Sequence, residues 1–438
     1  MDPWERITSP LTSKRRRAVL VASKCAMSFA SNSIGSRQST RNVECLYFAA
    51  LFVLLVSVFF LNCALDGSIA SPLHLASELD SPRSAPQDWL LQTKIPMRYR
   101  ALFSWIVRGT WSSFLPNSGG KGFYATYFFW SFAFFYAAVI ALYYLLRMLD
   151  FSKLLSFLGC ILFLSLPPVM LAYVWPVHTR EDPLAYLLVV LGIISVFRSK
   201  IIPLLIISVL GGLTRETTLI VPFLYAFYAK ESYWKKSLVC IVSVSSIIAV
   251  RIMLGYESYD PLGGGTYNVR HLPETIVFLF MTYGVFWIPS LVALYEKWTR
   301  RASFNYYWRI LVSSTPACLG LIVGTNFLFA RVKEIRISFL SFPWIIPMCL
   351  CWLRENVFRL KPLVATRHYR VYTTFACLLL YFVIFTLVEF GNLAGHLGAF
   401  YLQRWRLVGY IHMVLTVVIV VPLLLKRGTF RKSMLEGS

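Results

Sequence analysis

Twelve apolar runs, separated by short polar connections, constrain this chain more than any other feature of its sequence. The first extends from Cys45 to about Ala64. A helix that crosses a membrane needs about 20 predominantly apolar residues, and several runs reach that length. We therefore predict an all-α polytopic membrane protein with about 12 transmembrane or half-membrane helices. The other runs lie at approximately 123–146, 154–175, 183–197, 201–213, 217–229, 237–254, 275–296, 308–329, 337–353, 371–390 and 405–425.

Composition agrees with this class and argues against a nucleic-acid partner. The 438 residues are 57% hydrophobic and 14% charged, whereas soluble domains have about 25% charged residues. The net charge is +23, but the basic residues flank the apolar runs, as expected for the cytoplasmic ends of membrane helices. We predict membrane lipids as surroundings and no nucleic-acid partner. The nine cysteines and six histidines are scattered without metal-ligand spacing, so no metal site is predicted.

The distribution of lysine and arginine predicts the topology. If both termini are cytoplasmic, most of these residues fall in cytoplasmic segments, which is the usual bias. Residues 1–43 then form a basic disordered cytoplasmic tail, 44–427 a single transmembrane domain, and 428–438 a short cytoplasmic tail. Residues 65–122 form a long first extracytoplasmic loop. Cleavage of the first run as a signal near Ala64 is the alternative. The lack of an Asn-x-Ser/Thr sequon favours a bacterial inner (plasma) membrane.

A short polar run between two apolar runs is the first candidate site. Residues 213–217 read Leu-Thr-Arg-Glu-Thr, and each flanking run has about thirteen residues, or roughly 20 Å of helix. Such short helices place Arg215 and Glu216 at or below the outer rim of the bilayer, where ionisable residues are costly and usually functional. Arg215 near a helix N-terminus favours a bound anion. An ion pair, either Arg215–Glu216 or interhelical, is the alternative, and Thr214 is predicted to cap the second helix.

Two acidic positions on the same predicted side can carry catalysis. Asp66, directly after the first run, can act as a general base if it is desolvated, with a solvated loop aspartate as the alternative. Glu181 and Asp182 stand beside Arg180 and can bind a hydroxyl-rich acceptor or a metal. Asp182 before Pro183 also suits a helix N-cap.

Further cations gather on the predicted outer side. Arg331, Lys333 and Arg336 flank Glu334, which suits an anionic ligand, with snorkelling at the interface as the alternative. Residues 94–111 combine cations with helically spaced apolar residues and predict an amphipathic helix on the outer leaflet. This stretch includes Arg98, Arg100 and Arg108. Residues 263–265, three glycines without the Lys-Ser/Thr of a phosphate loop, predict a flexible loop.

The order and common side of four short motifs resemble the GT-C superfamily of polytopic membrane glycosyltransferases, in particular its less-characterised bacterial-type members. The resemblance covers most of the chain in organisation: a first span, a long outer loop, paired short helices and about a dozen spans. The motifs are Arg98-Tyr99-Arg100-Ala101-Leu102, Arg180-Glu181-Asp182-Pro183-Leu184-Ala185-Tyr186, Gly212-Leu213-Thr214-Arg215-Glu216-Thr217 and Glu334-Ile335-Arg336.

The resemblance implies transfer of a sugar from a polyprenyl-phosphate-linked donor to an acceptor hydroxyl on the extracytoplasmic face. The acceptor would be a glycan, lipid or protein. Asp66 would be the catalytic base, and Glu181 or Asp182 would orient the acceptor or the base. No cofactor is firmly implied, and a divalent metal stays open. A transporter or flippase of an anionic lipid or solute, and a scaffold without a ligand, remain alternatives. Donor binding would fall to Arg98, Arg100, Arg180, Arg215, Glu216, Glu334 and Arg336.

Overall fold

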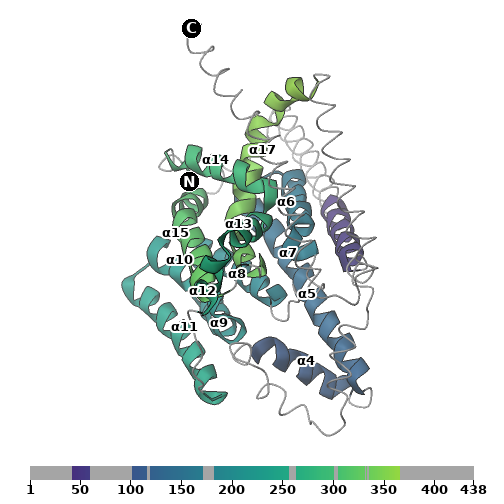
Figure 1. The fold of residues 1–438 in the computed structure, drawn as a ribbon, viewed down its shortest axis with the longest axis vertical. Helices are drawn as coiled ribbons and strands as arrows, with labels where there is room; N and C mark the ends of the chain where they lie inside the picture. Colours follow the sequence, from purple (N-terminus) through teal and green to yellow (C-terminus); the bar gives the residue numbers. More distant parts are fainter. Residues whose placement is uncertain are drawn as a thin grey trace, which may run out of the picture. The chain divides into compact units, whose positions relative to one another are not determined.

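The computed structural model describes residues 42–59, 101–115, 119–170, 182–255, 263–299, 304–330, 332 and 335–365, and this part of the chain is helical without a strand. The chain divides into two compact units, Met1–Phe52 and Val53–Ser438. The helices of the second unit (Figure 1) are α4 (Ala101–Phe114), α5 (Gly119–Met148), α6 (Lys153–Ser165), α7 (Pro167–Met170), α8 (Asp182–Phe197), α9 (Ile201–Thr214), η4 (Glu216–Leu219), α10 (Ile220–Tyr228), α11 (Tyr233–Met253), α12 (Gly263–Arg270), α13 (Leu272–Met281), η5 (Gly284–Phe286), α14 (Trp287–Trp298), α15 (Tyr306–Phe329), α16 (Ile335–Ser338), η7 (Phe339–Ser341) and α17 (Phe342–Ala365).

Several helices are long and apolar enough to cross a membrane. Within the described residues there are four: Asn42–Phe59, Ala125–Met148, Tyr233–Met253 and Tyr306–Phe329. A fifth results if Thr275–Met281 and Gly284–Trp298, which meet at 84°, form one broken span. The all-helical, membrane-like class is therefore confirmed. The count of about 12 stays a prediction, and the runs at 371–390 and 405–425 lie outside the described residues.

Helix α11 is apolar on its outside, which is the reverse of a water-soluble helix. Its exposed stripe carries four large aliphatic residues, and its buried stripe contains two serines. The buried stripe packs on α9, where a Cβ on Gly212 would overlap Ser246 Oγ. Small residues at helix contacts and large apolar residues outside are typical of helices solvated by lipid. The exposed stripe is Ile241, Val244, Ile248 and Ile252, and the buried stripe is Val239, Ser243, Ser246 and Val250.

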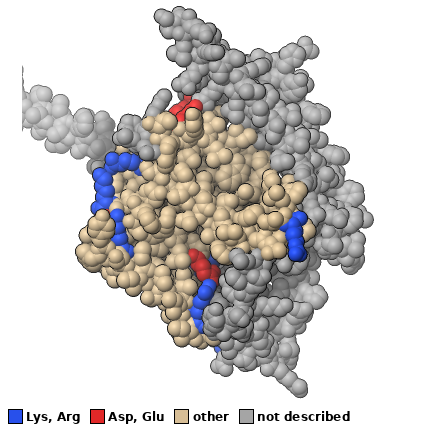
Figure 2. All heavy atoms as spheres, turned by 60° about the vertical axis from the view of Figure 1, so that its left-hand side comes forward, with Lys and Arg blue, Asp and Glu red and all other residues tan. Residues whose placement is uncertain are grey.

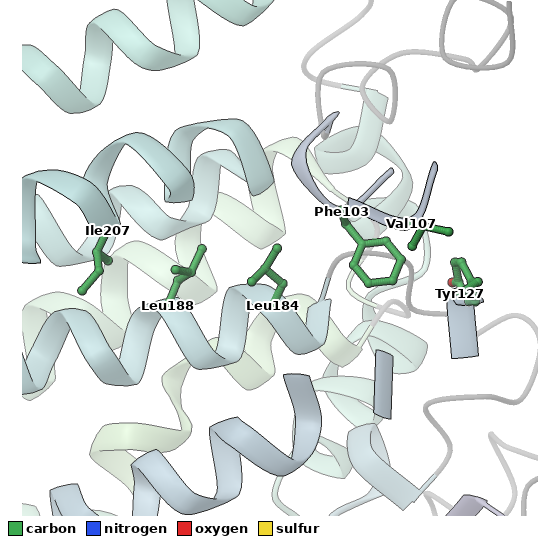
Figure 3. Close-up of a cluster of buried hydrophobic side chains, with 6 residues drawn as sticks. All are labelled: Phe103, Val107, Tyr127, Leu184, Leu188 and Ile207. Atoms are coloured by element: carbon green, nitrogen blue, oxygen red, sulfur yellow. The ribbon is translucent and has the colours of Figure 1, made fainter. Parts of the chain in front are cut away.

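A hydrophobic cluster joins α4 to α5, α8 and α9, and α4 itself packs on α5 and α9. Phe103 and Val107 of α4 lie beside Tyr127 of α5 (Figure 3), and the Phe103 and Tyr127 rings meet edge to face with centroids 5.3 Å apart. The cluster continues along α8 to α9 through Leu184, Leu188 and Ile207. The predicted amphipathic helix is thus present from Ala101, and its apolar face packs on protein. Residues 94–100 lie outside the described residues.

The bend between α13 and α14 is fixed by buried hydrogen bonds. Gly284 adopts a φ of 54°, a left-handed conformation that glycine adopts without strain. The hydroxyl of the neighbouring Tyr283 donates to Phe339 O at 2.9 Å and lies 2.9 Å from Ser341 Oγ. Phe339 and Ser341 belong to η7, itself an interruption between α16 and α17. Two broken helices therefore meet, and side chains complete part of the hydrogen bonding that regular helix would supply.

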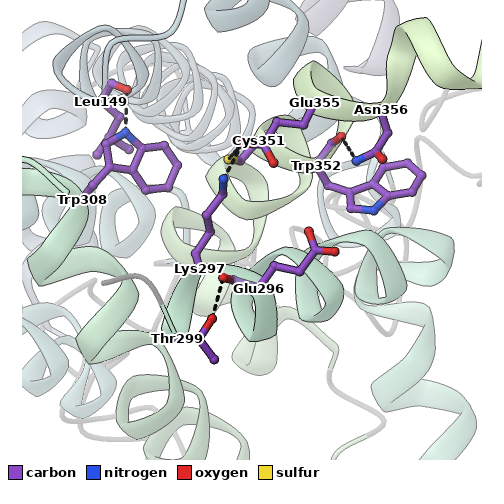
Figure 4. Close-up of polar contacts among 9 residues, drawn as sticks. All are labelled: Leu149, Glu296, Lys297, Thr299, Trp308, Cys351, Trp352, Glu355 and Asn356. Atoms are coloured by element: carbon purple, nitrogen blue, oxygen red, sulfur yellow. Dashed lines mark hydrogen bonds and ion pairs between the residues drawn. The ribbon is translucent and has the colours of Figure 1, made fainter. Parts of the chain in front are cut away.

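Polar contacts join the C-terminal end of α14 to α17 (Figure 4). A further hydrogen bond joins α15 to the end of α5. Lys297 forms an ion pair with Glu355, whose carboxylate also accepts a contact from Cys351 Sγ at 3.6 Å. Trp308 of α15 donates through Nε1 to Leu149 O at 2.9 Å, at the end of α5. These bonds fix helices that are far apart in the sequence.

The predicted flexible loop at residues 263–265 was wrong. Gly263, Gly264 and Gly265 begin α12, which packs on the C-terminal end of α15. A Cβ on Gly264 would lie 2.7 Å from both Ala330 N and Ala330 O. Glycine stands here because only hydrogen fits between the two backbones.

Replacing Gly264 with alanine should therefore destabilise the protein despite alanine's higher helix propensity. Displacing the Ala330 backbone should cost about 1–3 kcal/mol, measured by denaturant unfolding in detergent. Gly109→Ala in α4 is the matched control, because nothing lies within 4 Å of its Cβ position. It should be neutral or stabilise by up to about 1 kcal/mol. Equal stability of the two variants would contradict the close contact.

Candidate functional site

A buried ion pair joins the start of α8 to the break after α9. Arg215 Nη1 contacts Asp182 Oδ1, and the two side chains are 1% and 0% exposed. Helix α8 begins at Asp182, and Arg215 is the extended residue between α9 and η4. The interhelical ion pair, which the sequence left as an alternative, is thus the arrangement present. It brings together two residues that the sequence independently nominated as site residues.

The break between α9 and η4, which directs Arg215 toward α8, is fixed by local hydrogen bonds. The Arg215 N–H closes α9 on Gly211 O at 2.8 Å, while Arg215 O accepts from Thr218 N at 3.1 Å and Thr218 Oγ1 at 2.7 Å. A Cβ on Gly211 would lie 2.6 Å from Thr218 Oγ1, so glycine allows this tight turn. Thr214 belongs to α9 and donates to Leu210 O at 2.7 Å. The prediction that Thr214 caps the second helix was therefore wrong.

A second ion pair continues from the first to α11. Glu216 Oε1 lies 3.6 Å from Arg251 Nη2, and these side chains are 30% and 32% exposed. Arg215 and Glu216 are neighbours in sequence but contact different helices, Arg215 on α8 and Glu216 on α11. Arg251 was not among the predicted site residues. Its position inside an apolar run, close to the end of that run, was a signal that could have identified it.

The two ion pairs contribute differently to the free energy of unfolding. Breaking a fully buried pair leaves a charge without compensation in a medium of low dielectric constant and costs about 3–5 kcal/mol. A partly exposed pair contributes about 0–1 kcal/mol. The Asp182–Arg215 pair is therefore part of the framework, whereas the Glu216–Arg251 pair can exchange its partners for a ligand at low cost.

The remaining predicted site residues are not tested by these contacts. Asp66, Arg98, Arg100, Arg180, Glu181 and Glu334 lie outside the described residues, as does the side chain of Arg336 in α16. Their convergence with Asp182, Arg215 and Glu216 stays a prediction. Within the part of the chain that the structure describes, no group of three His, Cys, Asp or Glu side chains could hold a metal ion.

No protein-family model matches this chain, and no curated protein or solved structure is significantly similar to it. The site must therefore be interpreted from its own chemistry. The two guanidinium groups and two carboxylates are paired and carry no net charge together. The partly exposed Glu216–Arg251 pair is the part that can form charge-assisted hydrogen bonds to an anion or a hydroxyl group of a ligand.

Proposed function

We propose that this protein is a membrane glycosyltransferase that transfers a sugar from a polyprenyl-phosphate-linked donor to an acceptor hydroxyl. The observation that supports this proposal is the buried Asp182–Arg215 pair, beside the more exposed Glu216–Arg251 pair, in an all-helical apolar protein. Cations next to lipid-facing helices suit a donor whose phosphate must be held while its tail stays in the bilayer.

In this mechanism Asp66 deprotonates the acceptor hydroxyl, and Glu181 or Asp182 orients the acceptor or the base. Arg215, with Arg336 and Arg100, stabilises the negative charge that develops on the departing lipid phosphate, and preorganised charges of this kind supply a large part of many rate accelerations. In the structure Arg215 is paired with Asp182 and is 1% exposed, so binding of the donor phosphate by Arg215 requires this ion pair to open.

The test is transfer of labelled sugar from a polyprenyl-phosphate donor by the purified protein in proteoliposomes. The Asp66→Asn/Glu181→Gln variant should lose activity by about 10²-fold or more, since general acid–base groups contribute about 10²–10⁴-fold. Glu296→Gln on α14 is a control that keeps both ion pairs. Wild-type activity in the double variant would end the assignment.

A transporter or flippase of an anionic lipid or solute is the second candidate, and the broken helices favour it. The 84° bend between α13 and α14 meets the interruption at η7, and discontinuous helices line the binding sites of many transporters. The same proteoliposomes discriminate the two functions. Movement of a labelled anionic lipid between leaflets without a covalent product would support the transporter and refute the transferase.

A further inference from the structure

Two turns at one end of the α8–α11 group form a compact basic surface that the proposed function does not use. Arg198 and Lys200 in the α8–α9 turn and Lys230 before α11 are exposed, and Lys235 and Lys236 in the first turn of α11 are partly exposed. The Ser199 side chain is close enough to the Glu231 carboxylate to help lower its pKa, so the two turns lie near each other. We define the α9–α11 basic surface by its five cations, Arg198, Lys200, Lys230, Lys235 and Lys236.

The positive charge of this surface is not neutralised by its own acid. Glu231 is the one carboxylate in residues 198–200 and 229–236, and it pairs with Lys235 at 2.9 Å. The hydrogen bond from Lys235 lowers the pKa of Glu231, so this carboxylate stays ionised at neutral pH and still leaves four cations in excess. Figure 2 shows lysine and arginine in several separate places around a largely uncharged face, on which acidic side chains are few.

Exposed aromatic side chains adjoin the cations. Tyr233 and Trp234 begin α11 and are 88% and 64% exposed, and Lys236 Nζ lies 5.9 Å from the centroid of the Tyr233 ring. Tyrosine and tryptophan concentrate at the headgroup level of a bilayer. Because the lipid-facing stripe of α11 starts within two turns at Ile241, the basic surface lies where headgroups meet acyl chains.

We propose that the α9–α11 basic surface binds the phosphate-bearing headgroup of an anionic phospholipid. The lysines and Arg198 would hold the phosphate, and the lipid tails would run along the exposed stripe of α11. Lys200 and Ser232, the N-cap residues of α9 and α11, make no side-chain cap hydrogen bond, so the positive ends of both helix dipoles add to the attraction. The continuity between cations and lipid-facing stripe favours a lipid over free phosphate.

The experiment compares nanodiscs of phosphatidylcholine alone with nanodiscs that also contain phosphatidylglycerol. Phosphatidylglycerol retained by the full-length protein is measured by native mass spectrometry after extraction. Lys200→Gln/Lys236→Gln should weaken retention by about 30-fold, from the usual effect of two interfacial cations. Lys200→Arg/Lys236→Arg keeps both charges and should retain the lipid.

Arg270→Gln is the control for nonspecific charge, since Arg270 is exposed at the end of α12. Helix α12 packs on the C-terminal end of α15, whereas the α8–α9 turn lies by its N-terminal end, where Phe197 stacks on Tyr307. It should retain phosphatidylglycerol like the wild type. Wild-type retention in Lys200→Gln/Lys236→Gln, equal loss in Arg270→Gln, or displacement of the lipid by inorganic phosphate would each overturn the proposal. Size-exclusion and circular-dichroism profiles establish that the variants are folded, and the outcome is independent of any transferase activity.

Discussion

Arg215→Met should destabilise this protein by about 3–5 kcal/mol, because it leaves the Asp182 carboxylate buried without its cation. Both side chains are almost fully buried, so water cannot replace the lost partner. Asp182→Asn should have a cost in the same range, since it leaves the guanidinium without its counter-charge. The measurement is denaturant unfolding in detergent, followed by the helical circular-dichroism signal.

The double variant Asp182→Leu/Arg215→Met separates the structural role of the pair from its chemical role. Replacing both charges with apolar groups of similar size is often neutral or stabilising, so stability should return close to that of the wild type. Sugar transfer should be abolished in this folded variant, because it lacks both charges of the pair. Recovered transfer would show that the pair is structural alone and would remove Arg215 from the proposed phosphate site.

The partly exposed Glu216–Arg251 pair provides the matched comparison for the buried Asp182–Arg215 pair. Glu216→Gln leaves Arg251 partly in contact with solvent and should cost no more than about 1 kcal/mol. A cost for Glu216→Gln as large as that for Arg215→Met would contradict the different weights assigned to the two pairs.

Asn268→Leu should be the second strongly destabilising substitution, at about 3–5 kcal/mol. Asn268 is fully buried and donates through Nδ2 to Phe327 O and Ala330 O, both at 2.7 Å, while its Oδ1 accepts from Val332 N at 3.0 Å. The two carbonyls lie at the C-terminal end of α15, where helix carbonyls lack partners within the helix. Leucine would leave three backbone groups without this partner, the Val332 N–H buried and the two carbonyls partly buried, and each buried unsatisfied group costs about 1–3 kcal/mol.

Val269→Ala is the control for this position. Val269 is the next residue of α12 and is 62% exposed, so its truncation should change the unfolding free energy by less than about 0.5 kcal/mol. If Asn268→Leu were as stable as Val269→Ala, the connection between α12 and α15 would not depend on the Asn268 side chain.

Within the described residues, apolar run length predicted where most helices lie but not the breaks within the runs at 154–175 and 275–296, and local propensity predicted the turns poorly. The run at 201–213 matches α9, which ends at Thr214. Gly263 to Gly265 were mispredicted, because glycine signals a loop locally but here permits backbone contact with Ala330. Thr214 was mispredicted because its hydroxyl bonds within α9, a choice that helix-cap preferences do not resolve.

For the candidate site, the sequence likewise predicted some features and missed others. Depth in an apolar run was enough to nominate Arg215 and Glu216, since an ionisable residue in that position needs a reason. Nothing in the sequence identified Asp182 as the partner of Arg215, or Arg251 as the partner of Glu216. Those pairings depend on how α8, α9 and α11 pack, and α9 meets α11 through Gly212 and Ser246.

The sequence by itself determined that this is an all-helical protein suited to lipid, because run length and apolar content follow directly from the thickness and polarity of a bilayer. Only the tertiary structure decided which charges meet. Helix packing joins residues through steric fit between faces, and that fit depends on side chains from several helices at once. For this reason the buried contact of Asp182 with Arg215 and the closure of α15 by Asn268 became visible only in the folded chain.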